Sequence, residues 1–216
     1  MKETYSRTKP VWARMNEEER KATMEYGERY KKFLDTARTE RLAVTEILRQ
    51  AEAAGFKPLY DMKELRHYYG GIKKYQWTCI PMALIGVVYT RSGKKVEINV
   101  GMKDDDPVFY ISDLLIHMAQ DQMKKTLAQG ITGEQLQAIC ATHSEENLAA
   151  KDALMKFFKD TYGIEEEDFA TAELELVPAT KSRDVGFDRS LIASYGQDDR
   201  VCSYANLEAI LHAEPG

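Results

Sequence analysis

The feature that most constrains the fold is a pair of strand-like runs in the middle of the chain. Residues 77–101, WTCIPMALIGVVYTRSGKKVEINVG, hold two β-branched runs on either side of the turn dipeptide Ser92–Gly93. This pattern predicts an antiparallel β-hairpin. The longest apolar run, near Ile80 to Tyr89, is interrupted by Gly86 and is well short of the ~18 apolar residues of a membrane helix. The hairpin therefore favours a globular fold with no membrane partner.

The segment before the hairpin, Asn16 to Gly55, has helical periodicity. Asn16 is a suitable N-cap, with acidic residues in the first turn that follows it. The apolar positions form two separate stripes, with a break near 35–39 and a second start at Thr39. Gly55 ends the second stripe as a C-terminal cap does. The pattern predicts a pair of amphipathic helices whose apolar stripes pack in the interior.

Helices and strands alternate in the rest of the chain. We expect helices at 112–129 and 145–162, a strand at 171–178, a loop up to Gly196, and a last helix from near Asp198 to Glu214. Ser112 is the expected cap of the first of these helices, and Gly163 is expected to stop the second. The order of elements predicts a mixed α/β or α+β architecture.

Composition narrows the class of protein. Net charge is −5 over 216 residues, and charges of both signs are mixed along the chain without a basic patch, so nucleic-acid binding has no support. The three cysteines, Cys79, Cys140 and Cys202, are odd in number and far apart, which favours reduced thiols and a cytoplasmic setting. The N-terminal residues MKETYSRTKPVW lack an apolar signal region, so secretion is not expected.

The stretch SYGQDDRVC, residues 194–202, holds the main candidate for chemistry. Asp198 and Asp199 suit an N-cap and a first-turn acid that interacts with the helix dipole. Alternatively, one carboxylate at a strand-to-helix turn could bridge two divalent cations, with the neighbouring acid and Arg200 holding the turn or orienting the ligand. The residues alone leave both interpretations open.

Other side chains that could bind metal or act as nucleophiles form no recognisable motif. The four histidines, His67, His117, His143 and His212, make no HExxH or HxD pattern, and such residues are more often surface or packing positions. We expect Cys202 to be a buried helical thiol rather than a nucleophile. The acidic run at 104–107, DDDP, lacks a ladder of further calcium ligands and is expected to be a solvated turn.

Several long phrases resemble the aminopeptidase I / aspartyl aminopeptidase family of zinc metalloaminopeptidases, in its bacterial aminopeptidase I-like form. They are YKKFLDTARTERLAVTEILRQAEAAGFKPL, HYYGGIKKYQWTCIPMALIGVV, DDDPVFYISDLLIHMAQDQM and YGIEEEDFATAELELVPATKSRDVGFDRSLIASYGQDDRVCSYANLEAIL. The resemblance covers the chain from about Trp12 to Leu211. It implies a partial zinc-peptidase α/β domain, residues 1–67 and 172–216, with an inserted β-rich dimerisation domain at 68–171.

The resemblance also implies roles for individual residues. Asp198 matches the family's bridging zinc ligand, and the peptide bond after it, to Asp199, is commonly cis in this superfamily. His117, in LLIHMAQ, is similar to a histidine that the insert lends to the active site of the neighbouring subunit, where it helps to bind substrate. Family members assemble as oligomers and release N-terminal amino acids from peptides with the help of two zinc ions.

The chain also departs from the family pattern. It has no His-x-Asp motif between Leu59 and His67, and no EEIG-like motif, further Asp or C-terminal His after the last helix. Because Asp198 alone of the expected metal ligands is present, we expect the chain to retain no zinc and to be inactive by itself. Two alternatives stay open: an oligomerisation or regulatory module that pairs with itself or with a full-length homologue, and a gene fragment without independent function.

Overall fold

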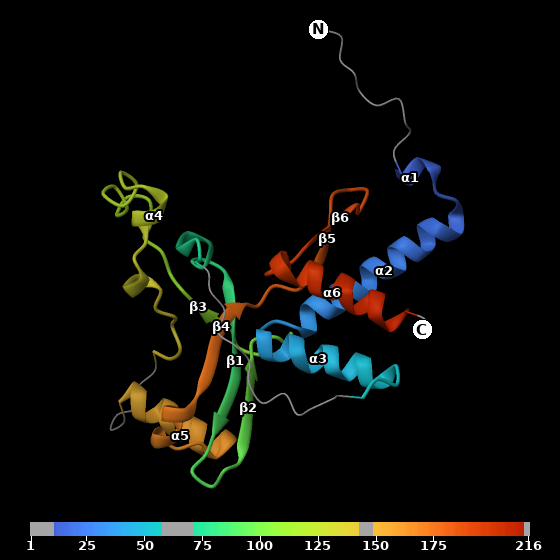
Figure 1. Ribbon diagram of the computed structural model, residues 1–216. Helices are drawn as coiled ribbons and strands as arrows, with labels where there is room; N and C mark the ends of the chain where they lie inside the picture. The colour runs from blue at the N-terminus through green and yellow to red at the C-terminus, as the bar shows by residue number, and fades with distance from the viewer. Residues whose placement is uncertain (1–10, 58–70, 143–148, 214–216) are drawn as a thin grey trace. The chain divides into compact units, whose positions relative to one another are not determined.

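The computed structural model describes residues 11–57, 71–142 and 149–213. The chain forms two compact units (Figure 1). Unit 1 is Met1–Met62 together with Lys181–Gly216, and unit 2 is Lys63–Thr180. Unit 1 is mainly helical and unit 2 is built on an antiparallel sheet, which confirms the predicted mixed α+β class. No helix in the described part of the chain is long and apolar enough to cross a membrane.

Unit 1 is organised by three helices, α2 (Glu17–Thr36), α3 (Glu40–Ala53) and α6 (Gln197–Leu211), with a short α1 (Val11–Arg14) before them. Asn16 caps α2 in a capping box: its side chain accepts from the backbone N–H of Glu19 at 2.8 Å, and Glu19 accepts from the Asn16 N–H at 2.8 Å. Thr39 caps α3 through the backbone N–H of Leu42. These caps confirm both predicted helix starts and the break between them.

The core of unit 1 forms where α2 and α6 face each other. Its buried members are Tyr30, Phe33, Leu34, Ala37, Tyr204 and Leu207. Ile192 packs on this core from a small antiparallel hairpin, β5 (Arg183–Val185) with β6 (Leu191–Ala193). The sequence pattern predicts only a loop here. The hairpin forms because tertiary contacts, such as the ion pair of Lys31 with Asp184 at 2.7 Å, hold two segments of weak intrinsic preference.

Unit 2 has the predicted hairpin at its centre. β1 (Pro81–Tyr89) pairs with β2 (Lys95–Val100) from Leu84↔Val100 to Tyr89↔Lys95, and the turn uses Gly93 at φ +80°. β4 (Glu173–Pro178) pairs along β1, and the two-residue β3 (Phe109–Tyr110) pairs with the start of β1. Residues 172–180 thus belong to unit 2, whereas the expected boundary placed them with the C-terminal segment.

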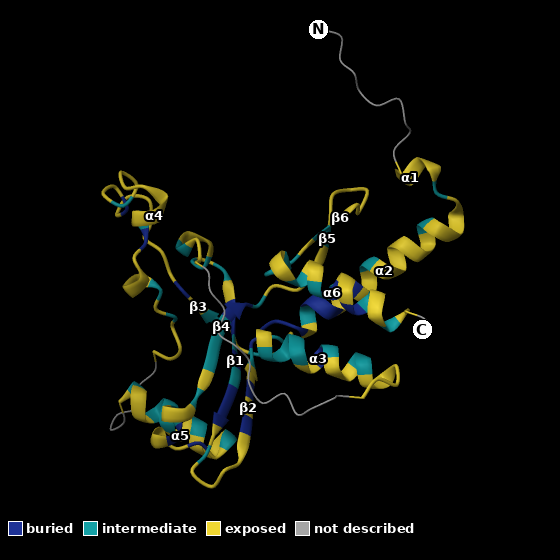
Figure 2. Cartoon of the chain, in the orientation of Figure 1, coloured by how far each residue is buried: buried dark blue, intermediate teal, exposed yellow. Residues whose placement is uncertain are grey.

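One face of this sheet packs against α5 (Ala150–Tyr162). The buried cluster is Val88, Val96, Ile98 and Ile164, with Phe158 and Tyr162 of α5 against it. Gly163, at φ +69°, ends α5 as predicted. Phe157 of the same helix is 50% exposed. Figure 2 shows β1 as the most deeply buried strand, while the chain around α4 (Leu127–Gly130) is largely exposed.

Gly86 allows the close approach of β4 to β1. It lies at φ +156°, and a Cβ built there would be 1.9 Å from the carbonyl oxygen of Glu173. That distance is far inside van der Waals contact, so no other residue fits without separating the strands. The interruption of the apolar run by glycine is therefore a requirement of the sheet.

The helix predicted at 112–129 is wrong. The segment consists of irregular chain and turns, with helix only at α4, and a short 3-10 helix at Gly133–Gln135 follows it. Its apolar side chains do have helical spacing, but they are exposed: Leu114, Leu115, Ile116, Met118, Met123 and Leu127 are each 49–73% exposed. A helix of this length is marginal without an apolar surface to pack on, and helical periodicity alone does not stabilise it.

Candidate functional site

The Asp198 turn joins β6 to α6. Gly196 precedes α6 at φ +62°, and Asp198 has non-helical angles, φ −88° and ψ 114°. The Asp198–Asp199 peptide bond is cis, as the family resemblance implies. The Asp198 carboxylate makes no capping hydrogen bond in the described part of the chain, so the predicted N-cap role is wrong. The backbone of Asp198 is extended rather than helical, and the side chains of Asp198 and Asp199 are both exposed.

Arg200 holds this turn against the end of α2. Its Nε donates to the carbonyl of Gly196 at 2.8 Å, and its Nη2 donates to the carbonyl of Tyr195. Its Nη1 donates to the carbonyl of Leu34, in the last turn of α2, at 2.7 Å and to that of Ala37, the C-cap of α2, at 2.6 Å. A guanidinium at a helix C-terminus satisfies carbonyls that have no partner within the helix and interacts favourably with the dipole. These hydrogen bonds are the means by which Arg200 holds the turn.

A second polar network fixes the chain that leads to the turn. Asp35 Oδ1 accepts from the backbone N–H of Ser182 at 2.8 Å, from the Ser182 hydroxyl at 2.7 Å and from Arg38 at 2.6 Å. The Ser182 hydroxyl also contacts that of Ser194 at 2.9 Å. Burial lowers the pKa of the Arg38 guanidinium, and the Asp35 carboxylate opposes that effect. Sequence reasoning missed this network, although an Asp and an Arg three residues apart at a helix end were its signal.

The two carboxylates of the turn act on each other. A hydrogen bond from protonated Asp199 to Asp198, and then the charge of Asp198, raise the pKa of Asp199, with a smaller contribution from burial. Two carboxylates that disfavour double ionisation at the end of a turn are a common arrangement at metal sites, where a cation relieves the repulsion. The turn therefore has one chemical property expected of a metal ligand.

The donor set does not fit a dinuclear zinc centre. Zinc in enzymes takes three or more protein ligands per ion from His, Asp, Glu or Cys. Across residues 11–57, 71–142 and 149–213, no group of three or more such side chains is placed to hold a metal ion. Asp198 and Asp199 thus lack the further ligands that two zinc ions require.

The remaining candidates lie elsewhere. His117 is exposed, in a turn at 116–118 rather than on a helix, and His212 is exposed at the end of α6. His67 and His143 lie outside the described residues.

Cys202, expected to be buried, is exposed because it lies on the side of α6 away from Tyr204 and Leu207. Asp106 organises the predicted acidic turn by accepting from the backbone N–H groups of Gly101 at 3.0 Å and Lys103 at 3.1 Å, which lower its pKa.

Comparison with known sequences relates this chain to one family of proteins. The family model for aminopeptidase I zinc metalloproteases (M18) matches residues 59–216. A probable M18 family aminopeptidase 1 of Clostridium acetobutylicum is 34% identical over 269 residues, which cover 94% of this chain and 58% of that protein. The corresponding protein of Thermotoga maritima is 35% identical over 267 residues, covering 96% and 58%.

Structural comparison agrees. The crystal structure of an M18 family aminopeptidase from Thermotoga maritima superposes with a TM-score of 0.83 at 34% identity, over 98% of this chain and 59% of that one. The chain thus spans less than two thirds of the length of these relatives. The aligned span in the Clostridium protein, 269 residues, also exceeds the 216 residues of this chain, so that protein has internal residues with no counterpart here. The matched family model, the sequence identity and the shared fold together show that this chain belongs to the aminopeptidase I zinc metalloprotease (M18) family.

Proposed function

We propose that this chain carries part of an M18 aminopeptidase active site, with Asp198 at the position of the bridging zinc ligand, and that it does not hydrolyse peptides by itself. The observation that carries this proposal is the isolated carboxylate pair: in the described parts of both units, Asp198 and Asp199 have no third metal-ligating side chain beside them. Supporting it, Arg200 holds the turn in place through main-chain carbonyls.

The chemistry explains why a single turn is insufficient. In a dinuclear hydrolase a carboxylate bridges two ions, other ligands complete each coordination sphere, and a separate base takes the proton of the attacking water. A bridging carboxylate without the other ligands competes poorly with water and buffer for zinc. The parent reaction, release of N-terminal amino acids from peptides, therefore needs groups beyond those of this turn.

The test measures metal content and turnover together. The purified chain is equilibrated with zinc, freed of excess metal, and assayed for zinc per chain and for hydrolysis of a panel of aminoacyl-nitroanilides, with the Thermotoga maritima relative treated identically. We expect well under one zinc per chain and no turnover, against metal binding and activity in the relative. Zinc near two per chain together with turnover would refute the proposal.

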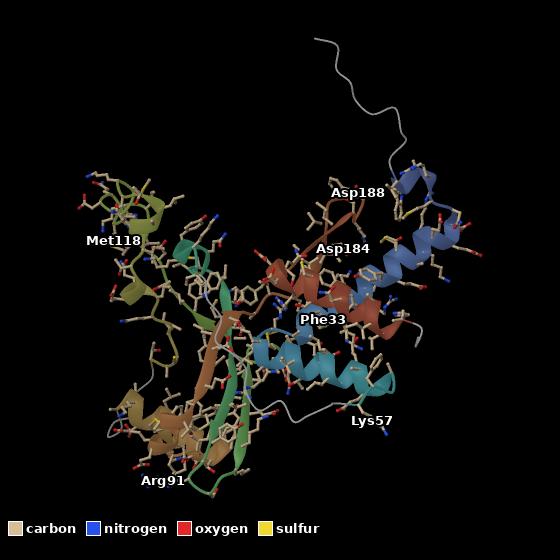
Figure 3. All side chains as sticks on the ribbon, in the orientation of Figure 1. Phe33, Lys57, Arg91, Met118, Asp184 and Asp188 are labelled. Carbon is tan, nitrogen blue, oxygen red and sulfur yellow. The ribbon has the colours of Figure 1, made fainter. Side chains whose placement is uncertain are left out.

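The exposed apolar segment of unit 2 supports a second function, as a pairing module. Figure 3 labels Met118 in this segment, which we call the apolar segment, residues 114–127. Ile116, His117 and Met118 follow one another in one turn, and all three are exposed. Exposed apolar clusters of this kind mark interaction sites. We propose that unit 2 pairs with a second copy or with a full-length homologue, and that His117 then reaches the partner's peptide-binding site.

Light scattering and co-purification test this pairing. We expect the wild-type chain to form a dimer or larger species and to co-purify with a tagged full-length homologue. Ile116→Asp is expected to abolish both results, whereas Tyr75→Asp, an exposed apolar position outside the apolar segment, is expected to preserve them. A monomeric chain that ignores the homologue would exclude the pairing function.

We also propose a cytoplasmic location. Its support is the set of three free, exposed thiols at Cys79, Cys140 and Cys202, which an oxidising compartment would modify. Fractionation of cells that express a tagged chain from its own promoter, with compartment markers, tests this location. Recovery in an oxidising compartment would contradict it.

A further inference from the structure

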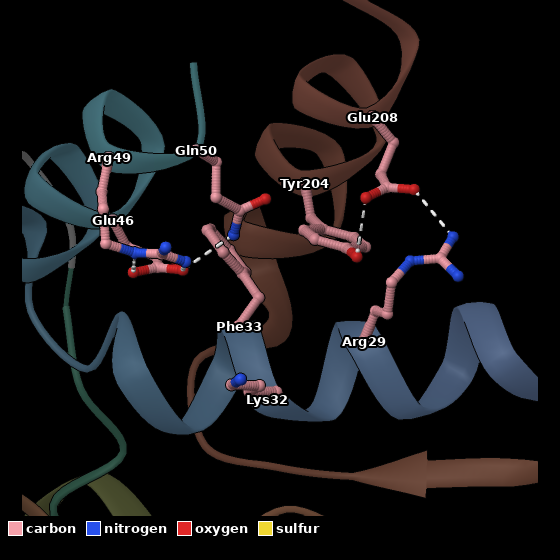
Figure 4. Close-up of a pocket in the computed structure, with 8 residues that line it drawn as sticks. All are labelled: Arg29, Lys32, Phe33, Glu46, Arg49, Gln50, Tyr204 and Glu208. Atoms are coloured by element: carbon pink, nitrogen blue, oxygen red, sulfur yellow. Dashed lines mark hydrogen bonds and ion pairs between the residues drawn. The ribbon is translucent and has the colours of Figure 1, made fainter. Parts of the chain in front are cut away.

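The helices of unit 1 enclose a pocket that is filled by its own interactions. This pocket, between α2, α3 and α6 (Figure 4), is lined by two aromatic rings, Phe33 and Tyr204, but each of these residues is only 1% exposed. Its two carboxylates, Glu46 and Glu208, each accept a hydrogen bond from an arginine that also lines the pocket. These side chains engage one another, so a partner of unit 1 has to use a surface outside this pocket.

The β5–β6 hairpin of unit 1 has an inner and an outer face. Its register pairs Asp184 with Ile192 and Val185 with Leu191. Because successive side chains of a strand point to opposite faces, Asp184 and Ile192 share one face, and Val185 and Leu191 share the other. Ile192 packs on the core of unit 1, and Asp184 forms an ion pair with Lys31 of α2 at 2.7 Å. The face with Val185 and Leu191 is therefore the outer one.

The outer face of the hairpin is apolar and exposed. Val185 is 40% exposed and Leu191 is 65% exposed, and the second pair on this face, Arg183 with Ala193, is exposed as well. Residues directly opposite each other in an antiparallel pair have Cβ atoms about 4.5–5.5 Å apart, so Val185 and Leu191 form one continuous patch. The loop between the two strands is also exposed (Figure 2).

The composition of β6 is that of a strand covered on both faces. An antiparallel hairpin with one solvated face commonly alternates apolar and polar residues, whereas all three residues of β6, Leu191–Ala193, are apolar. In the part of the chain that the structure describes, β5 and β6 pair only with each other, and an isolated two-stranded sheet is marginally stable. The hairpin thus has the character of a piece of a larger sheet that has helices on both sides.

The size of the outer face limits what can cover it. Three residues of strand extend about 10 Å, and two paired strands are about 10 Å wide, so the face measures on the order of 100 Å². A stable contact between two folded proteins buries about 800 Å² on each, so this face alone does not hold a second copy of the chain. A single helix, about 10–12 Å in diameter with its side chains, matches the width of the two strands.

The relatives of this chain contain polypeptide that has no counterpart in it. The Thermotoga maritima protein is matched over 267 residues, more than the 216 of this whole chain, so its matched region includes additional internal residues. The crystal structure from the same organism superposes on 98% of this chain, and this superposition takes up only 59% of the relative. In that relative the same fold therefore occurs together with further chain, which is a source of helices for an uncovered sheet face.

We propose that the outer face of the β5–β6 hairpin binds an amphipathic helix from a separate polypeptide, namely an M18 aminopeptidase segment that this chain lacks. The apolar side of the helix covers Val185 and Leu191, and an acidic residue at its border faces the exposed Arg183. This docking requires neither zinc nor the apolar segment of unit 2, so it stands apart from both functions proposed above.

The experiment titrates peptides into the complete 216-residue chain labelled with ¹⁵N. Overlapping peptides of about 20 residues, which is enough for five helical turns, span the internal Thermotoga maritima residues that have no counterpart here. We expect at least one peptide with helical apolar periodicity to give saturable shifts at the amides of 183–185 and 191–193, and its scrambled version to give none.

Three results of this titration would overturn the proposal. They are the absence of saturable shifts with every peptide, shifts that centre on residues outside the hairpin, and equal binding of a peptide and its scrambled version. Shifts of the hairpin amides that depend on protein concentration without any peptide would instead identify a second copy as the occupant, and would also overturn it.

Variants of the outer face test which residues receive the helix. Leu191→Asp is expected to weaken peptide binding about tenfold or more. Because a charge can also loosen the hairpin, Leu191→Thr, which keeps a residue suited to a strand, is measured as well and is expected to weaken binding roughly fivefold. Val11→Asp, at an exposed apolar position of α1, is expected to bind the peptide as the wild type does. Equal affinities for Leu191→Thr and Val11→Asp would refute the assignment of the patch.

Discussion

Replacement of Arg200 by Met is expected to destabilise unit 1 severely. The variant keeps a flexible apolar side chain of similar length but loses the guanidinium that donates to the carbonyls of Leu34, Ala37, Tyr195 and Gly196. Leu34 and Ala37 are 0% exposed, so water does not readily replace these donors. The helix end and the Asp198 turn lose their common partner.

The magnitude follows from the two helix carbonyls. A buried carbonyl left without a donor costs about 1–3 kcal/mol. The variant leaves two such carbonyls and loses the contacts of the turn, but it no longer has to bury the charge of Arg200. Subtracting that regained free energy leaves a net loss of roughly 3–5 kcal/mol. Burial lowers the pKa of Arg200, the direction expected when burying its charge costs free energy. A loss of this size lowers the melting midpoint of a domain of up to about 100 residues by on the order of 15 °C or more.

Arg29→Met is the matched control. Arg29 lies on the same unit, is 52% exposed, and makes a single ion pair with Glu208 at 3.0 Å. Because the Glu208 side chain is only 13% exposed, loss of Arg29 is expected to cost about 1–3 kcal/mol, less than loss of Arg200. Thermal unfolding by circular dichroism, with hydrogen exchange at the amides of α2 and α6, compares the two variants. Equal midpoint shifts for the two variants would refute the assignment of Arg200 as the residue that joins α2 to the turn.

Three further predictions concern the sheet, the pH dependence and the core. Gly86→Ala is expected to separate β4 from β1 and to lower the stability of unit 2 by roughly 3 kcal/mol or more in urea unfolding, while Gly133→Ala, with no atom within 4 Å of the new Cβ, is expected to have little effect. The lowered folded pKa of Glu208 means that its stabilisation is complete above the ordinary value of 4.5 and is lost as the pH falls through the folded value. The stability difference between wild type and Glu208→Gln is therefore expected to shrink on acidification below pH 4.5, and a constant difference would contradict this. Leu34→Ala, which opens a cavity at a fully buried position, is expected to cost about 2–5 kcal/mol of unfolding free energy, and a cost below that of an exposed Leu48→Ala control would count against the proposed core.

Local signals in the sequence predicted most of the regular elements. Asn16 and Thr39 begin helices because their side chains satisfy N–H groups only a few residues away, and Gly93 and Gly163 permit positive φ where the chain reverses or a helix ends. These interactions operate within a few residues, so the sequence pattern is enough to find them.

The candidate site was predicted in part. The position of Asp198 at a strand-to-helix turn was inferred from the residues and the cis bond after it from the family resemblance, and the structure has both. The partners of Arg200 and Asp35 did not follow, because their contacts join residues more than 140 positions apart in the chain. The pocket of unit 1 was missed for the same reason, since three separate helices each contribute only two or three of its residues.

The sequence by itself determined the helices of unit 1, the hairpin of unit 2 and the family to which the chain belongs. Tertiary structure decided which periodic segments became ordered elements. The segment 112–129 has helical spacing but no apolar surface to cover it, and it stays in turns, whereas 183–193 has a weak pattern and forms a hairpin on the core of α2 and α6. The physical reason is that burial of apolar surface, which depends on distant partners, contributes more to the stability of an element than its local preference does.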